Sequence, residues 1–173
     1  MNHYTILMMG YNSRSWIERS LISALNQNHP NFDVIAIDAE TNDGTYEYLK
    51  TMEEDHSSLS VVRNDPRQYQ VQNVYDGVRL AKDNSIVVTL DFDDALCHNM
   101  VLSTLDKYYT EDIWMTYGSM VQSGREGVVG FDRYPDGIIK SNSYRDVDWR
   151  ATHLRTFRKE LAVKIKEEDF KDD

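Results

Sequence analysis

The chain has 173 residues and a mass of 20.2 kDa, which is enough for one domain of ordinary size. Hydrophobic residues make up 40% of the sequence, yet no uninterrupted apolar stretch reaches the roughly 18 residues that a membrane span needs. The formal net charge of −10 disfavours binding to the phosphate backbone of a nucleic acid, so no nucleic-acid partner is expected.

Short apolar runs alternate with helical spacing through the first half of the chain. Ser13 or Ser15 can act as the N-cap of the first helix, and the Asp43-Gly44-Thr45 turn opens the second. The predicted strands are 4–9, 32–37, 59–62 and 86–90; the predicted helices carry Ile17, Leu21, Ile22 and Leu25, then Tyr46, Leu49 and Met52, then Val71, Val74, Val78 and Ala81.

The last third of the sequence is less regular. The pattern predicts a helix over 100–109, a strand over 113–121, a loop-rich stretch through residue 148 and a helix from about 154 to 165.

This alternation of strands and helices predicts an α/β fold with a mostly parallel central sheet flanked by helices. In such sheets, ligands bind beyond the carboxyl ends of the strands. Asp38 and Asp91 both follow predicted strands, so we expect them at the same edge of the sheet.

The most informative local pattern is Leu90-Asp91-Phe92-Asp93-Asp94, at the end of a predicted buried strand. Three crowded carboxylates repel one another unless a cation or several hydrogen-bond donors compensate them. A Mg²⁺ or Mn²⁺ ion held by Asp91, Asp93 and Asp94 keeps coordination positions open for phosphate oxygens. The alternative is a solvated acidic loop in which Asp94 caps the next helix.

Several motifs together resemble the family-2 glycosyltransferases of the GT-A fold. They are Tyr11-Asn12 after the first strand, Asp38 after the second, Asp43-Gly44-Thr45 and the Leu90 to Asp94 motif, in the family's order and spacing. The resemblance covers roughly residues 4 to 100. The sequence departs from the family pattern at Gly10, where the family often has Thr, and at Ala39-Glu40, where it has Asp-Gly.

The resemblance implies a donor site that binds a nucleoside-diphosphate sugar. It places Asp38 beside the nucleotide base, Asn12 near the pocket floor and Asp91 near the ribose or the metal. Arg63 or Arg67 is expected near the diphosphate or, alternatively, at the surface.

A second resemblance lies at Trp149 to Arg158, which is similar to a His-Leu/Phe-Arg-x-Phe segment of polysaccharide-building members. There the histidine completes the metal shell, which would make His153 a fourth metal ligand, and imidazole suits Mn²⁺ better than Mg²⁺. Arg155 and Arg158 can neutralise phosphate or simply face solvent. The alternative for His153 is a structural role at the start of a helix.

The implied activity is metal-dependent transfer of a sugar, from a UDP-sugar by preference, to a saccharide or other hydroxyl acceptor, with inversion. Residues 1–110 would form the nucleotide-sugar-binding half, and 111–173 the truncated start of an acceptor-side region within a single domain. No residue is identified as the catalytic base. A nucleotide-sugar-binding domain without activity is one alternative. Another is a haloacid-dehalogenase-like phosphatase with Asp91 as nucleophile and Asp93 as general acid.

A cytoplasmic location is expected for two reasons. The apolar run near the N-terminus is interrupted by Tyr11, Asn12 and Ser13 and so lacks the pattern of a secretory signal. Cys97 is the single cysteine, so the chain cannot form an intramolecular disulfide.

Overall fold

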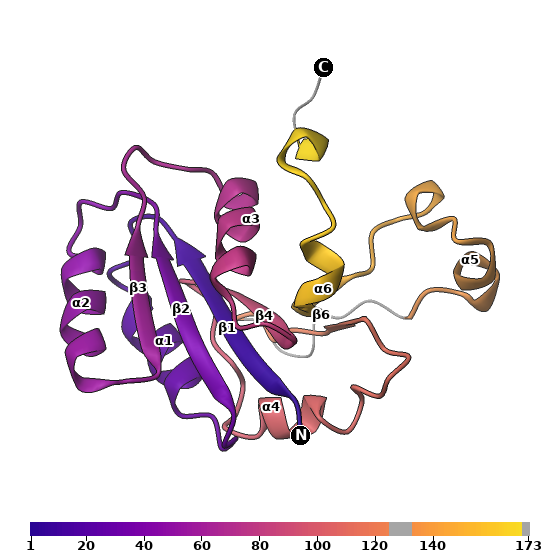
Figure 1. Ribbon diagram of the computed structural model, residues 1–173, viewed down its shortest axis with the longest axis horizontal. Coiled ribbons are helices and arrows are strands. Elements are labelled where there is room, and N and C mark those ends of the chain that lie inside the picture. The colour runs from indigo at the N-terminus through magenta and orange to yellow at the C-terminus, as the bar shows by residue number, and fades with distance from the viewer. Residues whose placement is uncertain (125–132, 171–173) are drawn as a thin grey trace.

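A computed structural model describes residues 1–124 and 133–170 (Figure 1). In this part of the chain six strands form one sheet with the order β3-β2-β1-β4-β6-β5. The strands are β1 (His3–Gly10), β2 (Phe32–Asp38), β3 (Leu59–Arg63), β4 (Ser85–Asp91), β5 (Met115–Gly118) and β6 (Thr152–Arg158). Strands β1 to β4 are parallel, whereas β6 runs antiparallel to both β4 and β5. The predicted α/β fold with a mostly parallel sheet is confirmed.

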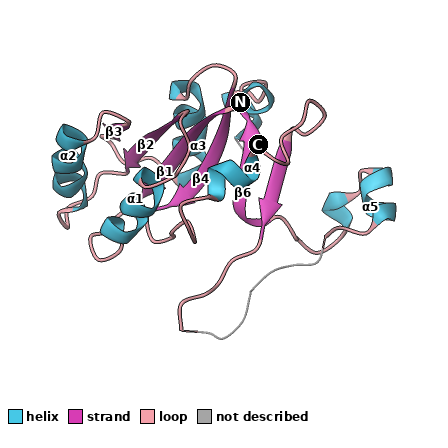
Figure 2. Ribbon diagram, turned by 90° about the horizontal axis from the view of Figure 1, so that it is seen from below, coloured by secondary structure: helices cyan, strands magenta, loops and turns pink. Residues whose placement is uncertain are grey.

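Helices cover both faces of the sheet (Figure 2). Residues of α1, α2 and α4 pack on one face, and residues of α3 and α6 pack on the other. The described helices are α1 (Ile17–Leu25), α2 (Thr45–Asp55), α3 (Gln70–Leu80), α4 (Val101–Leu105), α5 (Asp136–Ser141) and α6 (Lys159–Ala162), with 3₁₀ turns at Tyr144–Asp146 and Glu167–Phe170. Both figures show α5 beyond the β5–β6 side of the sheet, away from the other helices.

The apolar runs of the sequence become the inner strands because both of their faces are covered. Ile6 and Met8 point into the core cluster that includes Leu21 of α1. Leu7 and Val87 point into the opposite cluster, which includes Val78 of α3. Successive residues of one strand therefore enter different cores, and no polar alternation is visible in the sequence.

The strand order reverses between β1 and β4. β1 pairs with β2 on one side and with β4 on the other. The connection from β1 to β2 crosses one face through α1, whereas the connection from β3 to β4 crosses the other face through α3, so a crevice opens between the carboxyl ends of β1 and β4. Gly10 pairs with Asp38 and Met9 with Asp91, so both aspartates lie at this edge, as expected.

Residues 154–158 are strand rather than helix, so the predicted helix from about 154 to 165 is wrong there. Thr152, Thr156 and Phe157 are β-branched or aromatic, and Thr156 and Phe157 pair with Val88 and Val87 of β4. Sheet pairing thus determined the structure of a segment whose charged residues also fit an amphipathic helix.

Smaller differences concern the ends of elements. The helix predicted at 100–109 is the shorter α4, and the strand predicted at 113–121 is the shorter β5. Neither predicted serine caps α1, because the cap residue is Trp16 without a side-chain bond and the Ser13 carbonyl accepts the N–H of Ile17. The predicted loop through residue 148 contains α5 and a 3₁₀ turn, and its residues 125–132 lie outside the described part.

Among the described residues, no helix combines the length and the apolar character required to cross a membrane.

Candidate functional site

The acidic motif forms a tight turn at the end of β4. The N–H of Phe92 donates to the carbonyl of Met9, and the N–H of Asp94 donates to the carbonyl of Asp91. The first bond fixes the turn to β1, and the second folds Asp94 back toward Asp91. Phe92 is 1% exposed and anchors the turn in the core.

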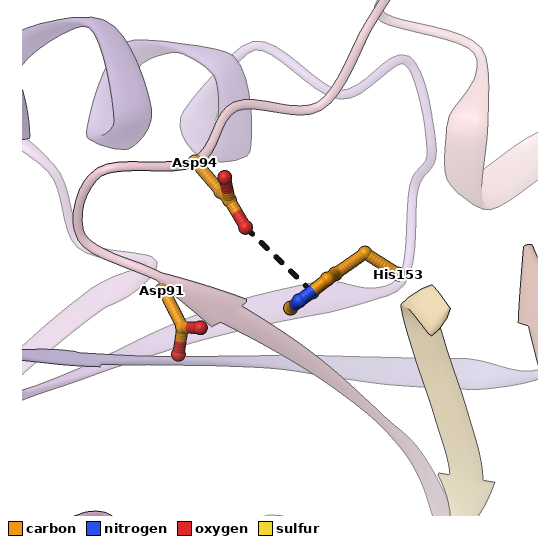
Figure 3. Close-up of side chains that lie close together, drawn as sticks. All are labelled: Asp91, Asp94 and His153. Carbon is orange, nitrogen blue, oxygen red and sulfur yellow. Dashed lines mark ion pairs between the residues drawn. The ribbon is translucent and has the colours of Figure 1, made fainter. Parts of the chain in front are cut away.

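Asp91, Asp94 and His153 come together at this turn (Figure 3). One potential ligand atom from each residue lies within 4.8 Å of the others. The Nδ1 atom of His153 lies 3.6 Å from Oδ2 of Asp94, longer than a direct hydrogen bond. Two carboxylate oxygens and an imidazole nitrogen at this spacing can bind one divalent cation.

Asp91 is partly buried, like the other two members of the group. Burial raises the pKa of its carboxyl above the ordinary value, the carboxylates of Asp94 and Asp93 add to the rise, and the charges of His153 and Arg155 oppose it. The Nε2 atom of Gln70 donates to Oδ1 of Asp91 over 3.2 Å. A bound cation would favour the ionised form of this carboxyl.

The antiparallel direction of β6 brings His153 to this turn. The pairing of β4 with β6 ends at Thr89 and Arg155. Asp91 lies two residues after Thr89, and His153 lies two residues before Arg155. Because antiparallel strands advance in opposite directions, both residues reach the same edge of the sheet.

Asp38 lies at the neighbouring strand end and is fully buried. Its Oδ2 atom accepts the N–H of Thr41 over 3.1 Å and lies 3.6 Å from Nε of Arg63. Its Oδ1 atom has no hydrogen-bond partner within the described chain, although it is buried. Buried carboxylate oxygens are normally bonded, so Asp38 retains acceptor capacity.

A cavity of about 380 Å³ opens between the ends of β1 and β4 and the start of α3. Its floor includes Gly10 and Phe92, which are in close contact: a Cβ atom placed on Gly10 would lie 2.6 Å from three Phe92 atoms. The other lining residues are Met9, Tyr11, Ser13, Ala39, Arg67, Gln68, Tyr69, Gln70, Asn73, Asp91 and Asp93. Most of the lining residues are therefore polar or aromatic.

Not every residue predicted for the site lies in this cavity. Asp93 is exposed and lines it, but stays outside the Asp91, Asp94 and His153 group. Asn12 is exposed beside the cavity, and its Oδ1 atom accepts the N–H of Asn42 over 3.1 Å. The bond connects the loop after β1 with the loop before α2.

The two candidate arginines separate. Arg63 donates through Nη2 to the carbonyl of Thr41 and lies 4.6 Å from the ring centre of Tyr46, outside the cavity lining. Arg67 lines the cavity, and its guanidinium carbon lies 3.7 Å from the ring centre of Tyr11.

Sequence reasoning did not assign roles to Tyr11, Tyr69, Gln70 or Asn73. Tyr11 directly follows the first strand, a position that places any side chain at the ligand-binding edge, so the order of elements already pointed to it. Gln70 and Asn73 lie at the start of α3. Only a prediction of where that helix begins could have placed them beside the ligand-binding edge.

Residues 5–165 match the family model described as Glycosyl transferase family 2. The chain belongs to glycosyltransferase family 2. The match extends beyond the acidic motif and includes the β6 segment with His153. A sequence comparison with curated proteins finds no match.

Several solved structures share the fold of this family 2 domain. One is the mannosyltransferase PcManGT from Pyrobaculum calidifontis in complex with GDP-Man and Mn²⁺, with 20% identity and a TM-score of 0.69 over 94% of this chain and 46% of that one. Another is S. aureus TarS 1–349, with 16% identity and a TM-score of 0.68 over 92% of this chain and 48% of that one.

The same S. aureus protein in complex with UDP-GlcNAc has 16% identity and a TM-score of 0.67, over 92% of this chain and 46% of that one. The family 2 domain described here thus spans less than half the length of these neighbours. At these identities the likeness establishes the fold.

Proposed function

We propose that this domain takes part in metal-dependent transfer of a sugar from a nucleoside-diphosphate sugar to a hydroxyl acceptor. The observation that carries the proposal is the convergence of Asp91, Asp94 and His153 at the edge of the sheet where α/β folds bind ligands. Membership of glycosyltransferase family 2 supports this reaction class.

The donor set suits Mn²⁺ or Mg²⁺, and the imidazole favours Mn²⁺. We propose Asp91, Asp94 and His153 as ligands, with Asp93 as a further ligand from the same turn. The partly buried carboxylate of Asp91 beside two other acids supports a cation here. When bound, the ion would neutralise the charge that the diphosphate gains as it leaves.

The rest of the donor site is proposed from the cavity lining and from the strand ends and loops next to it. Asp38 has an unbonded Oδ1 atom and is the proposed acceptor for the nucleotide base. Asn12 and Arg63 support the loops on either side, and Arg67 lies at the cavity mouth. We favour a UDP-sugar as donor; the solved neighbours were bound to GDP-Man or UDP-GlcNAc.

The transfer replaces one bond to the anomeric carbon with another. The bond to the β-phosphate oxygen breaks and its electron pair remains on that oxygen, while the acceptor oxygen bonds to the same carbon. With attack from the opposite face, the configuration inverts. The acceptor hydroxyl loses its proton to a general base, to which the proposal assigns no residue.

In this proposal residues 1–110 bind the nucleotide sugar, and residues 111–173 begin the acceptor side. The phosphatase alternative has no support from the family match. It also fits poorly with the position of Asp91 on the fourth strand rather than the first.

Nucleotide binding with and without Mn²⁺ tests the proposal. We expect calorimetric titration with UDP and GDP to show binding that requires the ion, and that Asp94→Ala and His153→Ala weaken it about tenfold or more, or ~1.4 kcal/mol. Asp55→Ala and His98→Ala are matched controls at exposed positions and should bind like the parent chain.

Equal affinity in chelator and in Mn²⁺ would contradict the metal dependence. Donor binding without transfer to any acceptor of a saccharide panel would favour the alternative of a binding domain without activity.

A further inference from the structure

Arg155 lies next to the proposed metal site but outside the ligand set. It pairs with Thr89 of β4, two residues before Asp91. The next pair along the ladder joins Val87 to Phe157, and both pack in the core cluster on the α3 face of the sheet. Alternation along the strand puts Arg155 on that same face. Its positive charge acts on the carboxylate of Asp91.

The side chain of Arg155 is partly buried, and no hydrogen bond to its guanidinium is formed by the residues that the structure describes. Its Nε atom is buried and has no hydrogen-bond partner among the described residues. Within the described ranges 1–124 and 133–170, Arg155 also makes no ion pair within 4.0 Å. Leaving a buried charged donor unbonded costs free energy, so such a group is expected to have an external partner.

The other arginine of β6 behaves differently. Arg158 donates from Nε to the carbonyl of Ile113 over 2.9 Å and from Nη2 to the carbonyl of Thr110 over 2.7 Å. Its donors hold the connection between α4 and β5, which accounts for its presence. Arg155 donates no such hydrogen bond to any residue of the described ranges.

The charges at the site indicate what the partner of Arg155 is. Asp91, Asp93 and Asp94 together with a diphosphate carry more negative charge than one divalent cation neutralises. A planar guanidinium can donate two parallel hydrogen bonds to phosphate oxygens, and it stays protonated at any physiological pH. A site that binds the diphosphate therefore gains from a protein cation beside the metal.

We propose that Arg155 binds the diphosphate of the donor and stabilises the leaving nucleoside diphosphate. This inference rests on the proposed function of the site. As the bond from the anomeric carbon to the β-phosphate oxygen breaks, the electron pair stays on the phosphate and increases its charge. Arg155 donates hydrogen bonds to that charge and transfers no proton, while the acceptor proton goes to the general base as above.

The test compares ligands with and without the diphosphate. The probes are UDP and GDP, with uridine and guanosine as their counterparts, titrated in Mn²⁺ against the parent chain and Arg155→Gln. We expect Arg155→Gln to weaken diphosphate binding at least tenfold and to leave nucleoside binding, followed by NMR titration, within twofold. Arg19→Gln removes the same charge from an exposed position of α1 and should leave both unchanged.

Each other outcome is decisive. Unchanged diphosphate affinity in Arg155→Gln, or an equal loss for diphosphate and nucleoside, overturns the role of Arg155. If Arg155→Gln fails to fold, Arg155→Lys replaces it, and a selective loss of threefold or more supports the role while its absence overturns it. A parent chain that binds neither UDP nor GDP in Mn²⁺ refutes the proposed function itself.

Discussion

The contact between Gly10 and Phe92 is the tightest constraint on the floor of the cavity. An added Cβ at Gly10 would lie 2.6 Å from Cβ, Cγ and Cδ2 of Phe92, whereas carbon atoms normally pack at about 3.5–4.0 Å. The overlap of about 1 Å involves Cβ of Phe92, which is attached to the backbone and has no freedom to rotate away. Gly10→Ala therefore requires the turn that carries Asp91 and Asp93 to shift.

We expect Gly10→Ala to lower the free energy of unfolding by about 1–3 kcal/mol, the range for overpacked cores. Urea denaturation followed by circular dichroism measures this change. Gly137→Ala is the matched control, because an added Cβ there meets nothing within 4 Å and the residue lies in α5. That control should be neutral or stabilising by up to about 1 kcal/mol.

Gly10→Ala should also weaken Mn²⁺-dependent nucleotide binding, since the displaced turn carries three proposed ligands, Asp91, Asp93 and Asp94. A Gly10→Ala protein as stable as the parent chain within about 0.5 kcal/mol, with the same nucleotide affinity, would refute the view that Phe92 holds the acidic turn against β1.

Two further predictions concern polar groups that hold the elements around the site. Lys159→Met should destabilise the fold by about 1–3 kcal/mol in urea, because Nζ of Lys159 donates to the carbonyl of Ala81 over 2.6 Å and to Asp83 in the turn between α3 and β4. Lys166→Met, at an exposed pair, should change stability by less than about 1 kcal/mol. At Asp106, burial alone would raise the carboxyl pKa, but hydrogen bonds from Asn2, His29 and Tyr4 outweigh it and hold that pKa below its usual value. The contribution of this carboxylate is therefore present above the unfolded-state pKa of about 3.9 and is lost as the pH falls through the lower folded-state pKa, so Asp106→Asn should flatten the acid limb of a stability-against-pH curve. An acid limb identical in the two proteins would contradict that assignment.

The parallel part of the sheet was predictable because its signal is local. Buried parallel strands appear as continuous apolar runs, and β1, β2 and β4 are such runs. The position of Asp91 at the end of β4 then follows from the order of elements, and the acidic motif predicts a cation there. Neither step requires knowing which residues of neighbouring strands pair with each other.

The structure of the β6 segment was not predictable from its own residues. Thr152 to Arg158 contains a histidine and two arginines, and only Thr152 and Thr156 are buried. Its strand conformation depends on pairing with β4 and β5 from distant parts of the sequence. The sequence left open which of Arg63 and Arg67 lies nearer the site for a similar reason, because that depends on the path of the loop between β3 and α3.

The direction of β6 decides whether His153 can act with the acidic motif at all. β4 contributes the residue at its carboxyl end, Asp91, whereas β6 contributes a residue near its start, His153. If β6 ran parallel to β4, the start of this seven-residue strand would lie at the opposite edge of the sheet, about 20 Å away at roughly 3.3 Å per residue. The antiparallel pairing therefore converts a large separation in sequence into a distance that one cation can bridge. It also carries Arg155 and Phe157 back along the α3 face, where the first meets the charge of Asp91 and the second anchors the strand in the core.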